Sequence, residues 1–256
     1  MSRGTAIRVR DIRKSFGGSP AVDGVSFDVD AGESVAIIGP NGAGKSTLFG
    51  LTAGEHRPDA GRVLLDGRDA TRWTAARRCR NGLSRTFQVA SFFASRTVRE
   101  NVEIACVAVT GRLPVADRFA RGSRDRESRI DEVLDLLDLT HLQSRLGRVL
   151  AQGDRKRLEF AMALVQRPQV LLLDEPTAGM SNEDIHKTIE MLLRVRRENS
   201  SLAVVLTAHD MDVVFAVCER VMLMGQGKLL LDGSPREVET HPITRSLYLG
   251  SKEESA

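Results

Sequence analysis

The feature that most constrains the fold is the run GPNGAGKS, Gly39 to Ser46, which fits the spacing G-x-x-x-x-G-K-[ST]. The apolar stretch SVAIIG precedes it and is typical of a buried strand, while LFGLTAG after it has the pattern of a helix that ends near Gly54. Glycines at this spacing let consecutive backbone N–H groups turn inward around an anion, and the start of the helix adds its positive dipole end. The sequence therefore predicts a strand, a phosphate-binding loop and a helix in succession.

Two side chains of this loop carry chemistry. Lys45 can reach the β- and γ-phosphates of a nucleotide, and the Ser46 hydroxyl can bind Mg²⁺. The residues expected around the nucleotide phosphates are Gly39, Pro40, Asn41, Gly42, Ala43, Gly44, Lys45, Ser46 and Thr47.

A second apolar run, LLLDE from Leu171 to Glu175, ends in two carboxylates. Its leucines predict a buried strand that delivers Asp174 to an exposed sheet edge, where the carboxylate can hold Mg²⁺. Glu175 follows directly and is placed to polarise an attacking water as a general base. Together with the loop at Lys45, this run predicts hydrolysis of a nucleoside triphosphate.

Strand and helix patterns alternate in the first and last thirds of the chain, which predicts an α/β fold with a parallel sheet covered by helices. The middle is helical in character, with segments at 98–109, 129–139 and 158–165. We expect one domain over 1–256, with a core lobe made of 1–89 and 168–256 and a helical insert at 90–167. The polar, arginine-rich stretch 112–129 is expected to be a solvated loop, with contact to lipid head groups as a weaker hypothesis.

Composition and charge exclude several classes of protein. Aromatic residues make up 4% of the chain, which argues against a surface built for stacking on bases. The net charge of +3 is slight and demands no anionic partner. We expect no membrane span and no signal peptide, because the chain has no apolar run of the roughly 18 residues that a span needs and its start has no long apolar core. The spacing of the three cysteines fits no metal motif, so we expect reduced, buried thiols.

With these motifs in this order, nearly the whole chain resembles the ATPase subunits of ABC transporters. Gln88 in RTFQVAS is similar to the family's glutamine between the lobes, and His209 in TAHD is similar to its switch histidine. Phe16 stands where an aromatic residue would stack on adenine, and LAQGD, Leu150 to Asp154, stands where the signature LSGGQ is usual.

The resemblance implies a P-loop NTPase sheet core with helices on both faces, an antiparallel β-subdomain and an inserted α-helical subdomain. It implies ATP and Mg²⁺ as cofactors, with Ser46, Gln88 and Asp174 at the metal. It implies catalytic roles for Glu175, for Gln88 and for His209, which would contact the γ-phosphate. Two subunits would close head to tail, so that Ala151 and Gly153 of one meet the ATP held by the other.

The resemblance narrows to the ATPases of branched-chain amino acid importers. RKRLEFAMAL after the signature, AGMS from Ala178 to Ser181, HDMDVVF, and the terminal YLG are all similar to that group. It implies a peripheral protein on the cytoplasmic face of the inner (cell) membrane, which works with permease subunits, a sister or identical ATPase subunit and, indirectly, a periplasmic binding protein. The surface near Gln88, with Phe92 and Phe93, is where those permeases are expected to dock.

Three alternatives stay open at this point. Urea importer ATPases share the AGM loop. A soluble ABC protein acting on ribosomes or nucleic acid usually has two phosphate loops or long inserts, whereas this chain has one loop at Lys45, so no nucleic-acid partner is expected. A small-molecule kinase would not need LAQGD or TAHD.

The signature departs from the family pattern at Ala151, which has no hydroxyl to offer a phosphate. A hydrogen bond to a charged group contributes roughly 1.5–3 kcal/mol. Gly153 and the helix start near it still present backbone donors, so we expect a working site with a looser closed dimer. Asp154 and Ser181 are two further departures, where the family commonly has Gln and Asp.

Overall fold

The computed structural model describes residues 4–86, 92–110, 122–208 and 210–250, and its centre is a six-stranded sheet in the order β10-β9-β3-β8-β7-β6. Neighbouring strands from β9 to β6 run parallel, and β10 lies antiparallel at one edge. This confirms the predicted parallel core. The strands are β3 Ser34–Ile38, β6 Leu83–Thr86, β7 Val170–Asp174, β8 Ala203–Thr207, β9 Arg220–Gly225 and β10 Lys228–Gly233.

Both faces of this sheet are buried, which is why its strands read as continuous apolar runs rather than as alternating ones. In β3, Val35 and Ile37 belong to one hydrophobic cluster, while Ala36 and Ile38 belong to another on the opposite face. Successive side chains of β3 point to opposite faces of the sheet, so this one strand contributes to two separate hydrophobic cores.

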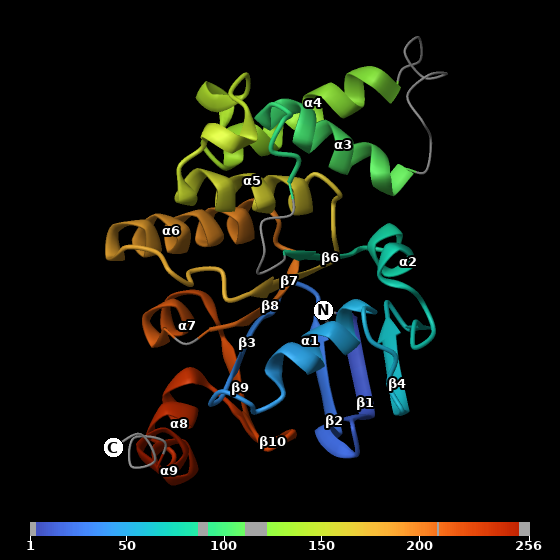
Figure 1. The fold of residues 1–256 in the computed structure, drawn as a ribbon, viewed down its shortest axis with the longest axis vertical. Coiled ribbons are helices and arrows are strands. Elements are labelled where there is room, and N and C mark those ends of the chain that lie inside the picture. Colours follow the sequence, from blue (N-terminus) through green and yellow to red (C-terminus); the bar gives the residue numbers. More distant parts are fainter. Residues whose placement is uncertain (1–3, 87–91, 111–121, 209, 251–256) are drawn as a thin grey trace.

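One face is covered by α1, Lys45–Ala53, and by a second, antiparallel sheet in the order β2-β1-β4-β5. Figure 1 shows α1 between this sheet and the central one. The second sheet confirms the antiparallel subdomain that the family resemblance implied. Its strands are β1 Thr5–Phe16, β2 Ser19–Asp30, β4 Ala60–Leu65 and β5 Arg68–Asp69.

The far end of α1 is held by a buried charge. Arg78 of α2, Ala75–Arg80, has no exposed surface, and its guanidinium donates to the carbonyl oxygens of Leu51, at 2.7 Å, and of Thr52. Those carbonyls belong to the last turn of α1, where intrahelical donors run out. Burial lowers the pKa of Arg78 to about 10, so the side chain is still charged at neutral pH. This contact fixes α2 against the helix that follows the phosphate loop.

The other face carries the remaining helices, with α3, α4 and α5 grouped at the top of Figure 1 and α6 and α7 closer to the sheet. The helices are α3 Val98–Thr110, α4 Gly122–Leu136, α5 Gln152–Leu164, α6 Asn182–Glu198, α7 Met211–Val217, α8 Pro235–Thr240 and α9 Pro242–Gly250, with short 3-10 turns η1 Thr140–Leu142 and η2 Gly147–Val149. In the part of the chain that the structure describes, none of these is long and apolar enough to cross a membrane.

The expectation of a loop over 112–129 was wrong for its second half, because 122–129 forms the start of α4. The apolar stripe that begins at Ile130 is buried against the core, and the helix extends from it towards its N-terminus through Arg, Glu and Ser residues. Arginine and glutamate are good helix formers, so this extension needs no apolar periodicity of its own. Residues 112–121 lie outside the described part.

Candidate functional site

The phosphate-binding loop joins β3 to α1 with glycines where no side chain fits. Gly39 has φ 148° and Gly44, the N-cap of α1, has φ 97°. A β-carbon on Gly39 would lie 2.2 Å from the Met224 carbonyl oxygen, and one on Gly44 would lie 2.3 Å from that of Ala21. The loop is thus pressed against β9 and β2, and its path is fixed by glycine at both ends.

Lys45 is the cation of this loop and is 6% exposed. Its ammonium donates to the carbonyl oxygens of Gly39 at 2.7 Å and Pro40 at 3.0 Å. Burial lowers the pKa of Lys45, while the nearby charges of Glu175 and Asp174 raise it. The structure therefore brings Lys45 and both predicted carboxylates within electrostatic reach of one another. Of the remaining loop side chains, Asn41 and Ser46 are exposed, Pro40 and Thr47 are half-buried and Ala43 is buried.

The two carboxylates follow the carboxyl end of β7, and a hydroxyl of the next strand links them. Thr207, at the end of β8, donates to one oxygen of Asp174 at 2.8 Å and accepts from the Glu175 backbone N–H at 2.9 Å. Asp174 is 2% exposed, whereas Glu175 is half-buried with φ 48°. The φ of Glu175 lies in the left-handed region, so the chain leaves the extended conformation directly after β7.

Arg85 of β6 is a site residue that the sequence did not reveal. Its guanidinium donates to Asp174 at 2.7 Å and to Glu55, just past α1, at 2.6 Å. The Arg85 side chain is 11% exposed. The signal in the sequence was a charged residue within a short strand whose other residues are buried. That signal does not indicate which carboxylate the arginine contacts. Thr207 was missed in the same way.

The oxygen atoms at this edge fit a magnesium ion. Mg²⁺ is held by one or two protein oxygens together with phosphate and water oxygens. Ser46 in the first turn of α1 and Asp174 are donors of that kind. Among the described residues there is no group of three or more His, Cys, Asp or Glu side chains that could hold a metal ion.

The signature segment begins α5, and Ala151 is its N-cap without a side-chain hydrogen bond. Gln152 donates to the Gly179 carbonyl oxygen at 3.4 Å, and a β-carbon on Gly153 would lie 3.5 Å from the Asp184 carboxylate. No hydrogen bond or ion pair within the described ranges joins Ala151 or Gly153 to the phosphate loop of the same chain. The first N–H groups of α5 thus have no side-chain cap, which leaves them able to bind an anion.

Two other departures from the family pattern have local explanations. Ser181 is the N-cap of α6, where its hydroxyl accepts from the Asp184 N–H at 3.2 Å and donates to the Asp184 carboxylate at 2.8 Å. Asp154 lies in the first turn of α5 and pairs with Arg157 at 3.3 Å. Both residues stabilise helix starts, where acidic and hydroxyl side chains are favoured.

Three predicted aromatic positions are described. Phe16 ends β1 and is 49% exposed, with its ring edge-on to His56 at 5.7 Å and the Lys14 ammonium 5.4 Å from its centre. Phe93 is 52% exposed, whereas Phe92 is half-buried and packs on the core, so only Phe93 is presented as an exposed ring. Gln88 and His209 lie outside the described residues.

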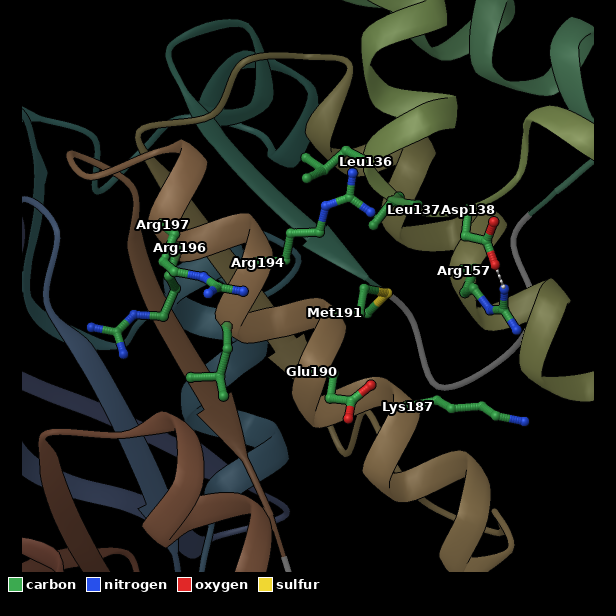
Figure 2. A pocket seen from close by; sticks show the side chains of 11 residues that line it. Leu136, Leu137, Asp138, Arg157, Lys187, Glu190, Met191, Arg194, Arg196 and Arg197 are labelled. Carbon is green, nitrogen blue, oxygen red and sulfur yellow. Dashed lines mark hydrogen bonds and ion pairs between the residues drawn. The ribbon is translucent and has the colours of Figure 1, made fainter.

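A hollow of about 1010 Å³ lies elsewhere, between the end of α4, α5 and α6 (Figure 2). It is lined by Leu136, Met191 and basic side chains such as Arg194 and Arg197, and it contains none of the predicted site residues. The hollow is therefore separate from the nucleotide chemistry.

The site combines a glycine-rich phosphate loop and its lysine with an Asp-Glu pair at the carboxyl edge of a parallel sheet. This combination is typical of an ATP-binding ATPase. The family profile described as ABC transporter matches residues 22–178, and the chain belongs to this family. It is thus an ABC transporter ATPase subunit.

Relatives with different transport roles are about equally similar. The lipopolysaccharide export system ATP-binding protein LptB of Haemophilus influenzae is 33% identical, over 96% of this chain and 98% of that protein. The high-affinity branched-chain amino acid transport ATP-binding protein BraF of Pseudomonas aeruginosa is 32% identical, over 95% of this chain and 97% of that protein. A nucleotide-free ATP-binding cassette from an ABC transporter has a TM-score of 0.83 and 28% identity, covering 95% of this chain and 98% of that one.

Proposed function

We propose that this subunit hydrolyses ATP to power the import of branched-chain amino acids, or of a related small polar solute, through separate permease subunits. The observation that carries the ATPase part is the grouping of Lys45, Asp174 and Glu175 at one sheet edge. The substrate part rests on the residues after the signature and on AGMS, HDMDVVF and YLG, which are similar to the branched-chain group.

Each residue of the site has a proposed role. Lys45 and the N–H groups of the phosphate loop hold the β- and γ-phosphates, and Phe16 stacks on the adenine. Ser46 and Asp174 hold Mg²⁺, which would neutralise phosphate charge during in-line displacement. Glu175 accepts a proton from the attacking water. For Gln88 at the metal and His209 at the γ-phosphate, the support is the family resemblance.

Replacing Glu175 by Gln tests the catalytic assignment. The amide keeps the side-chain size and leaves the backbone bond to Thr207, but it cannot accept the proton. Turnover is expected to fall by roughly 10²–10⁴ while ATP binding persists. Hydrolysis at the normal rate would exclude Glu175 as the base.

We propose a head-to-tail pair of ATPase subunits, either identical or sister chains. In such a pair the uncapped start of α5, with Ala151 and Gly153, would face the ATP of the partner and bind its γ-phosphate through backbone N–H groups. We keep the division into a core lobe of 1–89 and 168–256 and a helical insert of 90–167 as part of this proposal, because closure would move the α5 start relative to the phosphate loop.

The permeases are proposed to dock beside residues 92–97. Phe93 and Val149 are 52% and 61% exposed. Their segments are joined by backbone bonds from the Arg148 N–H to the Ala94 carbonyl and from the Gly147 N–H to the Arg96 carbonyl, both 2.9 Å. The two side chains thus belong to neighbouring segments on one surface, which suits an apolar partner element. Such docking would keep the subunit on the cytoplasmic face of the inner membrane.

The substrate is tested by purifying the tagged chain from its native membranes in mild detergent and identifying its partners by mass spectrometry. Import of branched-chain amino acids predicts two polytopic permeases, a second ATPase chain and a periplasmic binding protein encoded with them. Partners of an export system would instead favour the LptB relationship, and an amide-binding periplasmic protein would favour urea import. Ribosomal or DNA-bound partners without permeases would refute the transport proposal.

A further inference from the structure

A hollow of about 600 Å³ lies on the surface formed by β4, β5 and α2. Its lining includes Arg62, Asp69, Thr71, Arg72, Trp73 and Arg77, and we refer to it as the Trp73 pocket. A second hollow of about 380 Å³ shares Thr71 and Arg72 with it and adds Arg57 and Asp59. Neither hollow contains a residue of the nucleotide site.

None of the three arginines that line the Trp73 pocket forms an ion pair with an acidic residue of the described part of the chain. In the described ranges, Arg62, Arg72 and Arg77 are exposed, and their guanidinium groups make no ion pair and no hydrogen bond. On the same sheet Arg8 and Arg10 both pair with Asp28. The pocket therefore gathers three arginines without ion pairs on a sheet where Arg8 and Arg10 share a carboxylate.

Asp69 is the one carboxylate among the residues that line the pocket, and it is already engaged. It accepts from the Thr71 backbone N–H at 2.9 Å and so closes the turn between β5 and α2. Arg62 and Arg72 lie close enough for their charges to act on it, but not within ion-pair distance. Three cationic groups therefore face a single carboxylate, and the pocket keeps a positive excess.

Trp73 is the single tryptophan of the chain, and Arg77 lies over its ring, with the guanidinium carbon 4.6 Å from the ring centre. A guanidinium placed over an indole is attracted to the ring face, and its N–H groups can still donate to an oxyanion.

The backbone around these groups is fixed before any ligand arrives. Thr71 accepts from the Val63 N–H at 3.0 Å, and Thr74 caps α2 by accepting from the Arg77 N–H at 3.3 Å. Arg78, next to Arg77, is the buried residue that ties α2 to the end of α1. The pocket thus combines a fixed frame with unpaired cationic heads, an arrangement that reduces the ordering cost of binding.

We propose that the Trp73 pocket is a second anion site, for a phosphate mono- or diester bound by Arg62, Arg72 and Arg77. Guanidinium forks match the oxygen geometry of phosphate, and the indole covers the organic part of the ligand. The phosphate can come from an anionic phospholipid head group or from a soluble organic phosphate, and the two sources are separable by experiment. The site does not depend on the transported substrate.

The single tryptophan makes the test direct, because all indole emission of the chain comes from Trp73. The full chain is titrated with phosphatidylglycerol vesicles, with phosphatidylcholine vesicles at equal lipid concentration, and with glycerol phosphate at constant ionic strength. A blue shift with phosphatidylglycerol vesicles alone identifies the lipid source, and a change with glycerol phosphate identifies the soluble one. No change with either probe overturns the proposal.

Variants assign the binding to the pocket. The double variant Arg62→Gln, Arg72→Gln is expected to weaken binding roughly 30-fold. The matched control is Arg194→Gln with Arg197→Gln, two exposed arginines of α6, which has the same change of charge and is expected to bind like the parent chain. Equal weakening by both double variants would show a general charge effect and overturn the site.

Repeating the titration with the Lys45→Ala variant distinguishes binding at the Trp73 pocket from binding at the nucleotide site. A response of Trp73 that persists in this variant comes from the pocket, whereas a response that disappears comes from the phosphate loop and contradicts the proposal. Because ATP hydrolysis is measured independently, failure of the pocket and failure of the ATPase assignment give different results.

Discussion

The guanidinium of Arg85 donates to the carboxylate of Asp174 across 2.7 Å, from one parallel strand to its neighbour. Asp174 is 2% exposed, so the carboxylate proposed to hold Mg²⁺ already has a positively charged partner inside the protein. The same guanidinium contacts Glu55 just beyond α1. Arg85 therefore connects Asp174, at the end of β7, to the segment that follows α1.

Arg85→Met is expected to lower the free energy of unfolding by about 3–5 kcal/mol, because it leaves the buried Asp174 carboxylate without its charged partner. The measurement is urea unfolding of the variant and the parent chain. Arg96→Met is the control, since Arg96 pairs with Glu100 at an exposed site and is expected to change stability by less than about 1 kcal/mol. Equal losses of unfolding free energy in the two variants would show that the buried Arg85–Asp174 pair contributes no more to stability than an exposed pair.

Thr207→Val should reduce both stability and turnover. Valine keeps the shape of threonine but leaves the Glu175 N–H and one Asp174 oxygen without their partner, at a cost of about 1–3 kcal/mol. Thr207→Ser keeps the hydroxyl and is expected to retain the positioning of Glu175. Steady-state kinetics with unfolding curves separate the two variants, and identical behaviour of Val and Ser would contradict the bridging role.

Ala151→Ser is expected to raise the free energy of unfolding by about 0.5–2 kcal/mol, because serine at an N-cap accepts from a free N–H of the first turn. The control Ala108→Ser, at an exposed position inside α3, is expected to lower it by a few tenths of a kcal/mol. Chemical denaturation measures both. No gain for the Ala151 variant would mean that the α5 start is already satisfied.

The thiols should be unreactive in the folded chain at neutral pH. Burial raises the pKa of Cys218 to about 12, and it also raises the pKa values of Cys79 and Cys106. A raised pKa favours the neutral thiol, so the reactive thiolate forms only as the pH approaches that value. In the variant Cys79→Ser, Cys106→Ser, labelling of Cys218 by a disulfide reagent should be slow in the native state and fast in denaturant. Fast native labelling at neutral pH would contradict this burial.

Much of the fold follows from patterns along the chain. The loop from Gly39 to Ser46 predicted its own strand and helix, and LLLDE predicted a buried strand that ends in Asp174. The helix at 98–110 follows from the helical character of 98–109. These predictions succeed because local sequence and burial agree.

What the sequence could not predict depends on contacts between distant segments. Arg85 and Asp174 are side by side only because β6 and β7 are adjacent, and Thr207 meets Glu175 only because β8 follows next in the sheet. Strand β6 and helix α2 were missed because both are short and carry no clear period. Residues 122–129 were assigned to a loop because they are polar and have no apolar periodicity. They are helical because they continue, towards the N-terminus, the helix whose buried residues begin at Ile130.

The order of the central sheet also bears on how the chain is made. Strand β3, which leads into the phosphate loop, has β8 and β9 as its neighbours, and these are Ala203–Thr207 and Arg220–Gly225. During synthesis β3 therefore leaves the ribosome long before either neighbour exists, with both hydrogen-bonding edges open. The phosphate loop packs on Met224 of β9, so the ATP site can only form once about nine-tenths of the chain, to residue 225 of 256, has been translated. A nascent chain cut short before β8 therefore has an apolar strand that is open to aggregation.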